Sequence, residues 1–553
     1  MKQPPEKEEL SLVCMQPLAH EYVALNKNFS VGQTYVPELS CLTKISVFIK
    51  GPEHPEDKGA ITLGIRKKWN DASICSVSVP AEKISKDGEW VDFYFKEFPQ
   101  LDVGSQYLIH LSSDTHEQAA CKVAVATDYF YDLYPQGTAR CTGDNEDARA
   151  LINTDLAFKV YALKTPEKKS PLTKKIFFMN IDYADNFIIG PHGYGSLDGI
   201  SPQQEIFDSL KELKENGFDG VLWRVSFLGR AMYHSKTRDI FSSRDAKDDV
   251  RYNKLTEALT KCDPLKEAVA ACRKLDLKIY AWVLLNDEGR HREELASYFI
   301  QNPHLQWVSR KKEEYLSGVP CYAYPEVREH FLSQMKELME YNVDGIFMST
   351  RSHTSSFRRK ELLKYGFNEP VMDAFRDKYG KDIADEFIPE FDGDKFIELH
   401  GNLMNEFYRD VKNLRDKQFP DIKLAADLSN LPQNWPLLVK EKLIDNLMVN
   451  TQTGPSGILP GGNDYKDIPD YYFNAIKKMN GTTDVLMWMQ IASYKQETQQ
   501  AEHSKEKFYN DVLGIRQSKC RGAVVHEHAD FLRQPEKFWP YFIKARHEPV
   551  TSE

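Results

Sequence analysis

Apolar and polar residues alternate along the first third of the chain. The segments 45–49, 91–95 and 107–111 each carry apolar side chains at every second position. This period is typical of strands that bury one face. Many short segments of this kind, with no convincing long helix among them, predict an all-β sandwich or jelly roll over residues 10–163.

The pattern changes beyond residues 164–174, a polar segment with two prolines that we interpret as a linker. Short apolar runs then alternate with segments whose apolar residues recur three or four positions apart, as in helices. Eight runs are predicted to be buried strands: 175–181, 220–225, 278–285, 343–348, 422–426, 444–449, 484–489 and 522–525. Eight strands alternating with helices predict a (β/α)8 TIM barrel over residues 175–545.

Nearly every predicted barrel strand ends in a polar side chain. The carboxyl ends of such strands meet at one end of a barrel, where chemistry is placed. The candidate substrate-binding residues there are Arg224, Trp223, Asn286, Asp287, Arg351, His353, Gln490, Trp488, His526 and His528. Planar polar groups mixed with aromatic rings suit a sugar, which offers hydroxyls and apolar C–H faces. The alternative is that some of these residues cap helices, pair with one another or, like Trp488, pack in the core.

Glycoside hydrolysis requires two carboxyl groups across the scissile bond. Asp427 directly ends an apolar run and Glu527 lies just beyond the last one, so they are our first choice, with Asp182 in reserve. The sequence leaves open which of them is the acid.

Glu369 is a fourth catalytic candidate. It lies in an Asn-Glu-Pro tripeptide, which is the acid/base signature of one large group of barrel glycosidases when it ends strand four. Here it falls some twenty residues past that strand. In the alternative, Asn368 is a helix N-cap with Glu369 in the first turn.

Two clusters allow further interpretations. His526 and His528 would share one face of a strand, so they could bind a metal with Asp182 or Asp427. Hydrogen bonding to the substrate is the interpretation we favour. Arg224, Arg351 and His353 form a cationic group that either pairs with carboxylates or binds a sulfated or uronate substrate.

Composition narrows the classes of partner and cofactor that we expect. A formal net charge of -10, spread along 553 residues, gives no basis for nucleic acid or anionic membrane as the main partner. No apolar run reaches the ~18 residues of a membrane span. No dinucleotide fingerprint or P-loop occurs, so no organic cofactor is expected. The nine cysteines contain no CxxC. They are either buried thiols or form one or two bridges before residue 150.

Several segments resemble the glycosyl hydrolase-like family 10 proteins, which are barrel proteins of bacterial polysaccharide-degrading systems. The resemblance covers roughly residues 175–531 and is carried by KIYAWVLLN, AYPEVREHFLSQMKEL, VDGIF and YGFNEPVMDAFRDKYGKDI. Many relatives carry an aspartate after strand four, where this chain has Ser349. That departure keeps open a barrel that binds glycans without cleaving them.

The resemblance implies a secreted or periplasmic glycoside hydrolase acting on a polysaccharide. The signal peptide would be absent from this sequence. The N-terminal region is similar in architecture to carbohydrate-binding jelly rolls. The alternatives are a non-catalytic glycan-binding barrel and a metal-dependent hydrolase.

Overall fold

The computed structural model describes residues 10–19, 21–53, 58–96, 99–116, 120–127, 131–142, 149–151, 154–163, 174–183, 202–242, 250–289, 295–350, 363–383, 390–428, 433–450, 465–490, 501–526, 528–533 and 535–548. Two compact units divide the chain. The first is formed by residues 1–171, 456–471 and 551–553, and the second by 172–455 and 472–550. The predicted linker lies almost entirely outside the described residues.

The first unit contains a seven-stranded antiparallel sheet. Its strands are β1 (Leu10–Gln16), β2 (Glu21–Leu25), β4 (Lys44–Lys50), β7 (Glu89–Tyr94), β9 (Cys121–Thr127), β12 (Thr154–Leu156) and β13 (Phe158–Leu163). Their order is β1-β13-β4-β9-β12, with β2 paired to β9 and β7 paired to β4.

A second antiparallel sheet has six strands. They are β3 (Ser30–Tyr35), β5 (Ala60–Arg66), β6 (Cys75–Pro80), β8 (Tyr107–Ser113), β10 (Ala139–Thr142) and β11 (Arg149–Ala150), in the order β11-β10-β3-β8-β5-β6. Ile45 and Val47 of the first sheet belong to the same buried cluster as Ile61 and Leu63 of the second. The alternating residues therefore build one core between two sheets, as predicted, whereas jelly-roll connectivity stays a prediction.

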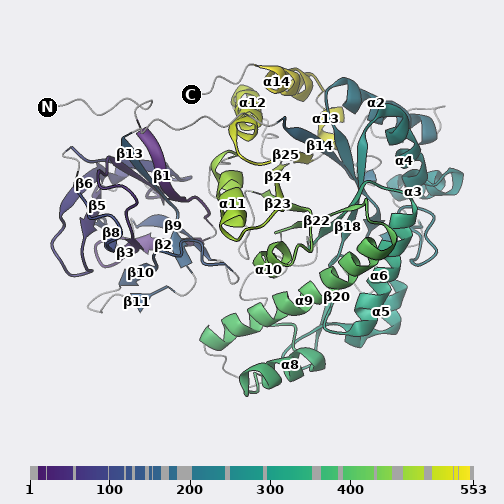
Figure 1. The fold of residues 1–553 in the computed structure, drawn as a ribbon, viewed down its shortest axis with the longest axis horizontal. Coiled ribbons are helices and arrows are strands. Elements are labelled where there is room, and N and C mark those ends of the chain that lie inside the picture. The colour runs from purple at the N-terminus through teal and green to yellow at the C-terminus, as the bar shows by residue number, and fades with distance from the viewer. Residues whose placement is uncertain are drawn as a thin grey trace. The chain divides into compact units, whose positions relative to one another are not determined.

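Eight parallel strands of the second unit close into a barrel, which confirms the predicted architecture (Figure 1). They are β14 (Ile176–Ile181), β15 (Gly220–Arg224), β18 (Lys278–Leu284), β21 (Gly345–Ser349), β22 (Lys423–Asp427), β23 (Asn446–Asn450), β24 (Asp484–Gln490) and β25 (Gly522–His526). Each strand overlaps its predicted run, with ends that differ by one or two residues.

Helices alternate with these strands and lie outside the barrel (Figure 1). The α-helices of the described residues are α2 (Pro202–Glu215), α3 (Val250–Lys261), α4 (Pro264–Leu275), α5 (Ser297–Gln301), α6 (Pro325–Glu340), α8 (Glu369–Tyr379), α9 (Glu390–Gln418), α10 (Trp435–Lys440), α11 (Asp467–Lys478), α12 (Ala501–Gln517), α13 (His528–Arg533) and α14 (Pro535–His547). Helix α4 starts as its sequence predicts, because the Asp263 side chain accepts the Lys266 backbone N–H at 3.3 Å and Pro264 follows it.

Two hairpins were not predicted. β16 (Ser226–Phe227) pairs with β17 (Arg230–Ala231) after β15, and β19 (Gln306–Val308) pairs with β20 (Tyr315–Pro320) between α5 and α6. The second hairpin packs closely on the chain that leaves β18. A Cβ on Gly318, whose φ is +75°, would lie 2.1 Å from the Gly289 carbonyl oxygen.

Side chains fill the interior of the barrel. Phe178, Leu222, Trp282, Phe347 and Trp488 belong to a single buried cluster. Because side chains alternate across a strand, these residues identify the inward-facing positions on their strands. Every second residue toward the C-terminal end of each strand therefore also points into the barrel.

An aspartate precedes three strands at the N-terminal end of the barrel. Its backbone N–H donates to the carbonyl of a residue on the preceding strand, and its carboxylate accepts the N–H of that same residue. The pairs, with their carboxylate distances, are Asp219 with Phe177 (2.9 Å), Asp344 with Ile279 (3.0 Å) and Asp445 with Leu424 (2.9 Å).

Each of these aspartates also binds an arginine from a helix. The ion pairs are Arg546 of α14 with Asp219 at 2.7 Å, Arg273 of α4 with Asp344 at 2.8 Å, and Arg415 of α9 with Asp445 at 3.0 Å. We call this arrangement of an aspartate, two backbone bonds and an arginine the aspartate clamp. The three clamps tie neighbouring strands and helices together at the end of the barrel away from the candidate site.

All nine cysteines lie in described ranges, and each is a free thiol. The disulfide alternative is therefore wrong, and the buried-thiol interpretation holds for five of them: Cys121, Cys262, Cys272, Cys321 and Cys520. Within the described ranges, no helix combines the length and the apolar character that crossing a membrane requires.

Candidate active site

The C-terminal end of the barrel gathers side chains from at least six strands. These residues lie at or just beyond the strand ends, and each either points into the barrel or bonds a residue that does. The described ones are Asp182, Arg224, Asn286, Asp287, Ser349, Thr350, Asp427 and His526. We call this group the barrel mouth. The structure thus brings together most of the sequence-predicted residues that it describes.

An ion-pair network occupies one side of the mouth. Arg224 Nη1 pairs with Asp182 Oδ2, and Nη2 lies 3.3 Å from Asp287 Oδ2. The Arg224 Nε donates to the Ser226 carbonyl at 2.8 Å, and all three charged residues are at most 3% exposed. Of the two interpretations of Arg224, carboxylate pairing is therefore the one the structure supports. Arg351 and His353, the other members of the predicted cationic group, lie outside the described residues.

Asp427 lies on the other side of the mouth, where hydroxyl groups hold it. Ser349 Oγ donates to Oδ2 at 2.5 Å, and the backbone N–H and hydroxyl of Thr350 donate to Oδ1 at 2.9 and 3.2 Å. Asp427 is 8% exposed, which keeps part of it in reach of solvent. Three donors fix both oxygens of this carboxylate and direct it as an acceptor.

Asp182 and Asp427 stand across the mouth from each other. Asp182 directly follows β14, and Asp427 ends β22. These are the first and fifth strands in the order of the closed barrel, so half of the barrel separates them on either side. Two carboxylates that face each other across an opening can flank a bound glycosidic bond.

Three aromatic rings from β18, β24 and β25 form a cluster that we call the floor of the mouth. The Trp488 and His526 rings lie 5.0 Å apart between centroids, and Trp282 lies 5.8 Å from Trp488 and 6.3 Å from His526. Trp488 and His526 are each 7% exposed, whereas Trp282 is 1% exposed. Trp488 and His526 are therefore the two rings nearest to solvent, and Trp282 lies deeper.

The segment that leaves β18 adds a second buried acid. Glu288 is fully buried, pairs with Arg238 through Oε1, and has no partner for Oε2 among the described residues. Burial raises the pKa of Glu288, although the Arg238 charge opposes this shift. Next to it, Asn286 Nδ2 donates to the Thr350 carbonyl at 3.2 Å.

His528 does not share a strand with His526. β25 ends at His526, and His528 begins helix α13. The premise of the metal alternative, two histidines on one strand face, is therefore wrong. His528 is fully buried, and burial lowers the pKa of its imidazole to about 4, so it is neutral at physiological pH. Among the described residues, no three His, Cys, Asp or Glu side chains are grouped to hold a metal ion.

Glu369 lies away from the mouth. It begins helix α8, which Figure 1 shows beyond α9 from the barrel strands. Its side chain is 75% exposed and pairs with Lys312 at 2.9 Å. Asn368 occupies the N-cap position, but its side chain instead bonds the backbone of β19, donating to the Gln306 carbonyl at 2.8 Å. The expectation of a catalytic Glu369 is therefore corrected.

Three further predicted residues need separate placement. Trp223 is out of phase with its inward neighbours Leu222 and Arg224, is fully buried, and contacts Tyr183 at a ring distance of 5.3 Å. It faces the outside of the barrel, which corrects its assignment to substrate binding. Gln490 is paired with His526 through the backbone. Glu527 lies outside the described residues, so its catalytic role stays a prediction.

Sequence reasoning missed several residues of the mouth. Ser349 and Thr350 are not among the predicted site residues, although hydroxyl groups at the end of a strand that precedes an acid-bearing strand are a usable signal. Asn180 was overlooked, although an asparagine inside the apolar run of β14 is conspicuous. It is fully buried.

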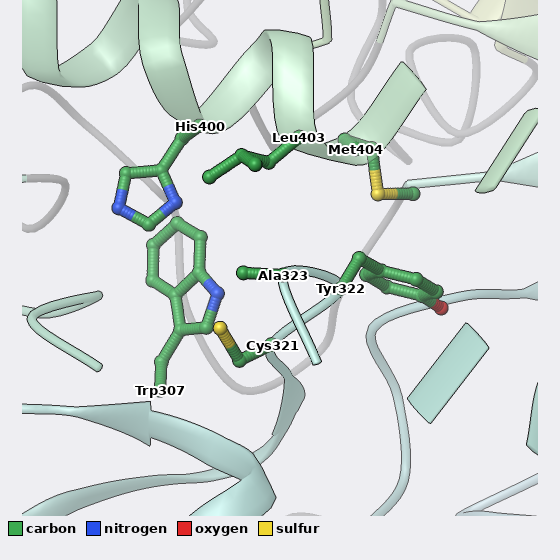
Figure 2. Close-up of a pocket in the computed structure, with 7 residues that line it drawn as sticks. All are labelled: Trp307, Cys321, Tyr322, Ala323, His400, Leu403 and Met404. Carbon is green, nitrogen blue, oxygen red and sulfur yellow. The ribbon is translucent and has the colours of Figure 1, made fainter. Parts of the chain in front are cut away.

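A separate cavity lies between the β20–α6 connection, β19 and α9 (Figure 2). It is lined by Trp307, Cys321, Tyr322, Ala323, His400, Leu403 and Met404. The Tyr322 hydroxyl already donates to the Leu285 carbonyl at 2.8 Å, and burial lowers the pKa of His400 to about 4. The described residues that line this cavity include no aspartate or glutamate, so we do not assign the chemistry to it.

No family model matches the chain, and no curated protein matches its sequence. Solved structures that resemble it include α-L-fucosidase isoenzyme 2 from Paenibacillus thiaminolyticus, at 12% identity and a TM-score of 0.41, over 68% of this chain and 49% of that one. The chain thus spans about half the length of that fucosidase.

The catalytic domain of β-amylase from Paenibacillus polymyxa also has 12% identity and a TM-score of 0.41, over 68% and 99% of the two chains. The glycoside hydrolase domain of PelA from Pseudomonas aeruginosa has 12% identity and a TM-score of 0.30, over 58% and 91%. These neighbours carry the names of glycosidases. At such identities and TM-scores the likeness decides nothing about activity.

Proposed function

We propose that this protein is a glycoside hydrolase that cleaves a polysaccharide at the barrel mouth. One observation carries the proposal: Asp427, whose carboxylate accepts three hydrogen bonds, ends a strand of the closed barrel at the mouth where Trp488 and His526 also lie. Carboxylates supply the proton transfer and the attack, and Trp488 offers a plane on which a sugar ring packs. The location outside the cytoplasm rests on the family resemblance alone and is part of the same proposal.

The hydrogen bonds divide the roles. Asp427 accepts from Ser349 and Thr350, so it acts as the base that activates water or as the nucleophile. The proton donor is then Glu527 or Asp182. Because Asp182 Oδ2 is already engaged by Arg224, we favour Glu527, the residue after His526.

The test combines three substitutions with a panel of neutral, uronate-containing and sulfated polysaccharides. We expect wild type to release new reducing ends from at least one of them. Asp427→Asn and Glu527→Gln should lower that turnover by about 10²–10⁴-fold while binding is retained. Asp182→Asn discriminates the donors, since a loss as large as that of Glu527→Gln would reassign the acid to Asp182.

Glu406→Gln is the matched control, because Glu406 is an exposed carboxylate on α9 paired only with Arg409 among the described residues. Its turnover should equal that of wild type. Unchanged turnover in both Asp427→Asn and Glu527→Gln would remove these residues from the reaction.

A second candidate function is glycan binding without cleavage. One observation favours it: Ser349 occupies the position where many resembling proteins carry an aspartate, and its hydroxyl donates a hydrogen bond to Asp427. Under this alternative, calorimetry detects binding of a polysaccharide from the same panel to wild type, wild type releases no reducing ends, and Asp427→Asn weakens the binding.

A further inference from the structure

Asn180 is a buried polar side chain with unused hydrogen-bonding capacity. It is fully buried, and in the part of the chain that the structure describes neither its amide oxygen nor its amide nitrogen has a partner. A buried amide normally finds partners, because burial without them costs stability. Asn368 shows the ordinary case: it is 2% exposed, donates to the Gln306 carbonyl at 2.8 Å and accepts from the Val308 N–H at 3.3 Å.

The register of the barrel places Asn180 in the mouth. Phe178 belongs to the interior cluster, so Asn180, two residues further along β14, points inward as well. Met179 pairs with Val525 on β25, and the next pair therefore sets Asn180 beside His526. Asp182, one of the two opposed carboxylates, stands two residues further on the same face.

A second unpaired donor lies close to the same ring. The Trp282 indole N–H is buried and, within the described ranges, has no acceptor. The Trp282 ring lies 6.3 Å from that of His526, whose neighbour on the next strand is Asn180. Two buried polar groups without partners therefore flank the ring that closes the floor of the mouth.

We infer that Asn180 is a specificity-determining residue of the barrel mouth, whose carboxamide hydrogen-bonds a hydroxyl group of the bound sugar. The inference rests on the proposed function. A carboxamide offers one acceptor and a pair of N–H donors on a planar group, and an alcohol is both donor and acceptor, so one hydroxyl satisfies both sides. A site that leaves such a group unpaired when the hydroxyl is missing discriminates strongly against deoxy sugars.

An ordered water could also donate to and accept from the Asn180 carboxamide. The stability of the free protein distinguishes a resident water from a sugar hydroxyl as its partner. If a sugar hydroxyl is the partner, the free protein carries an unpaired amide, and the near-isosteric Asn180→Leu should unfold at the same or a higher urea concentration than wild type. If a resident water satisfies the amide, Asn180→Leu should unfold at a lower concentration. Asn368→Leu is the control that must lose stability, because it removes bonds that are already made.

Ligand binding is measured by thermal shift with the methyl glycosides of glucose, galactose, mannose, xylose and fucose. We expect at least one of them to raise the melting temperature of wild type and of Asn368→Leu. The apparent affinity should be about tenfold weaker for Asn180→Leu, the loss of one hydrogen bond. The matching deoxy glycoside should bind wild type as weakly as the hydroxylated one binds Asn180→Leu.

Three results would overturn the inference: a destabilised Asn180→Leu, an unchanged affinity in that variant, or no glycoside that shifts wild type. Failure of the proposed function looks different. In that case no polysaccharide is hydrolysed, while the glycoside shifts still report on Asn180.

Discussion

The two ends of the barrel use carboxylates in opposite ways. At the N-terminal end, each clamp aspartate exchanges two backbone hydrogen bonds with a neighbouring strand and binds an arginine. At the C-terminal end, the carboxylates are also held, but buried polar atoms around them have no partner among the described residues, as in Asn180, Asn286 and Glu288. Satisfied groups stabilise a fold, whereas unsatisfied ones persist where a ligand completes them.

The pKa shifts at the two ends differ in direction. Burial raises the pKa of both Glu288 and Asp445. For Asp445, the Leu424 N–H, Lys423 and Arg415 outweigh burial, and the pKa falls below its ordinary value. For Glu288, the Arg238 charge does not outweigh burial, and the pKa stays raised. Asp445 thus has enough donors and positive charge to offset its burial, whereas Glu288 does not.

The largest effect is expected from Asp427→Asn at the C-terminal end. Turnover per folded molecule should fall by about a thousandfold, because the amide neither activates water nor attacks. The urea midpoint should move little, since the amide oxygen can still accept from the Thr350 N–H and hydroxyl, and the amide nitrogen can donate to the Ser349 hydroxyl oxygen. Rate measurements and urea titrations on the same preparation check the turnover and the urea midpoint. If Asp427→Asn unfolded at a much lower urea concentration than wild type, Asp427 would have a structural role like that of the clamp aspartates.

Asp344→Ala should produce the reverse phenotype. It leaves the Ile279 N–H without its side-chain acceptor and Arg273 without its carboxylate, so the free energy of unfolding should fall by about 2 kcal/mol. Turnover per folded molecule should be unchanged. Asp410→Ala, which removes one exposed ion pair with Arg328, is the control and should cost under about 1 kcal/mol. Equal losses of unfolding free energy in Asp344→Ala and Asp410→Ala would show that the clamp does not stabilise the barrel more than an ordinary ion pair does.

The Asp445 clamp predicts a pH dependence. Because the folded-state pKa of Asp445 is lowered, its contribution to stability is complete above the unfolded pKa of about 3.9 and disappears as pH falls through the folded value. Asp445→Asn should therefore be less stable than wild type near neutral pH, by about 1 kcal/mol, and the gap should close in acid. Urea midpoints measured across this range decide the point; a gap that widens in acid contradicts it.

The smallest effect is expected from Glu369→Gln. The side chain is exposed, and Lys312 lowers the pKa of its carboxyl through one solvent-screened pair. Neither turnover nor the urea midpoint should change measurably. A large loss of turnover would bring α8 back to the active site and revise the placement of the mouth.

The sequence predicts the barrel well because its strands are buried on both faces. Such strands read as continuous apolar runs, and all eight were found with ends that differ by one or two residues. The same property hides which neighbour points inward, since both faces are apolar. Trp223 was therefore chosen beside Arg224, although only Arg224 faces the mouth. The two short hairpins depend on tertiary packing and leave no periodic signal.

The candidate site was only partly predictable for a related reason. Residues that end a strand, such as Asp182, Asp427 and His526, could be named because strand ends converge. A partner supplied by another strand, such as Ser349 for Asp427, is a contact over 78 positions and becomes visible only in three dimensions. Glu369 shows the opposite error, in which a short motif suggested chemistry that its position on α8 does not support.

The clamp pattern has a gap. The pair β24 and β25 keeps the backbone bond, from the Arg521 N–H to the Val485 carbonyl at 2.8 Å, but position 521 carries arginine where the other three pairs carry aspartate. Local opening of a folded protein occurs most readily where stabilising contacts are fewest. Exchange of amide protons with deuterium should therefore be faster between β24 and β25, the strand that ends at His526, than between the strands of the three clamped pairs.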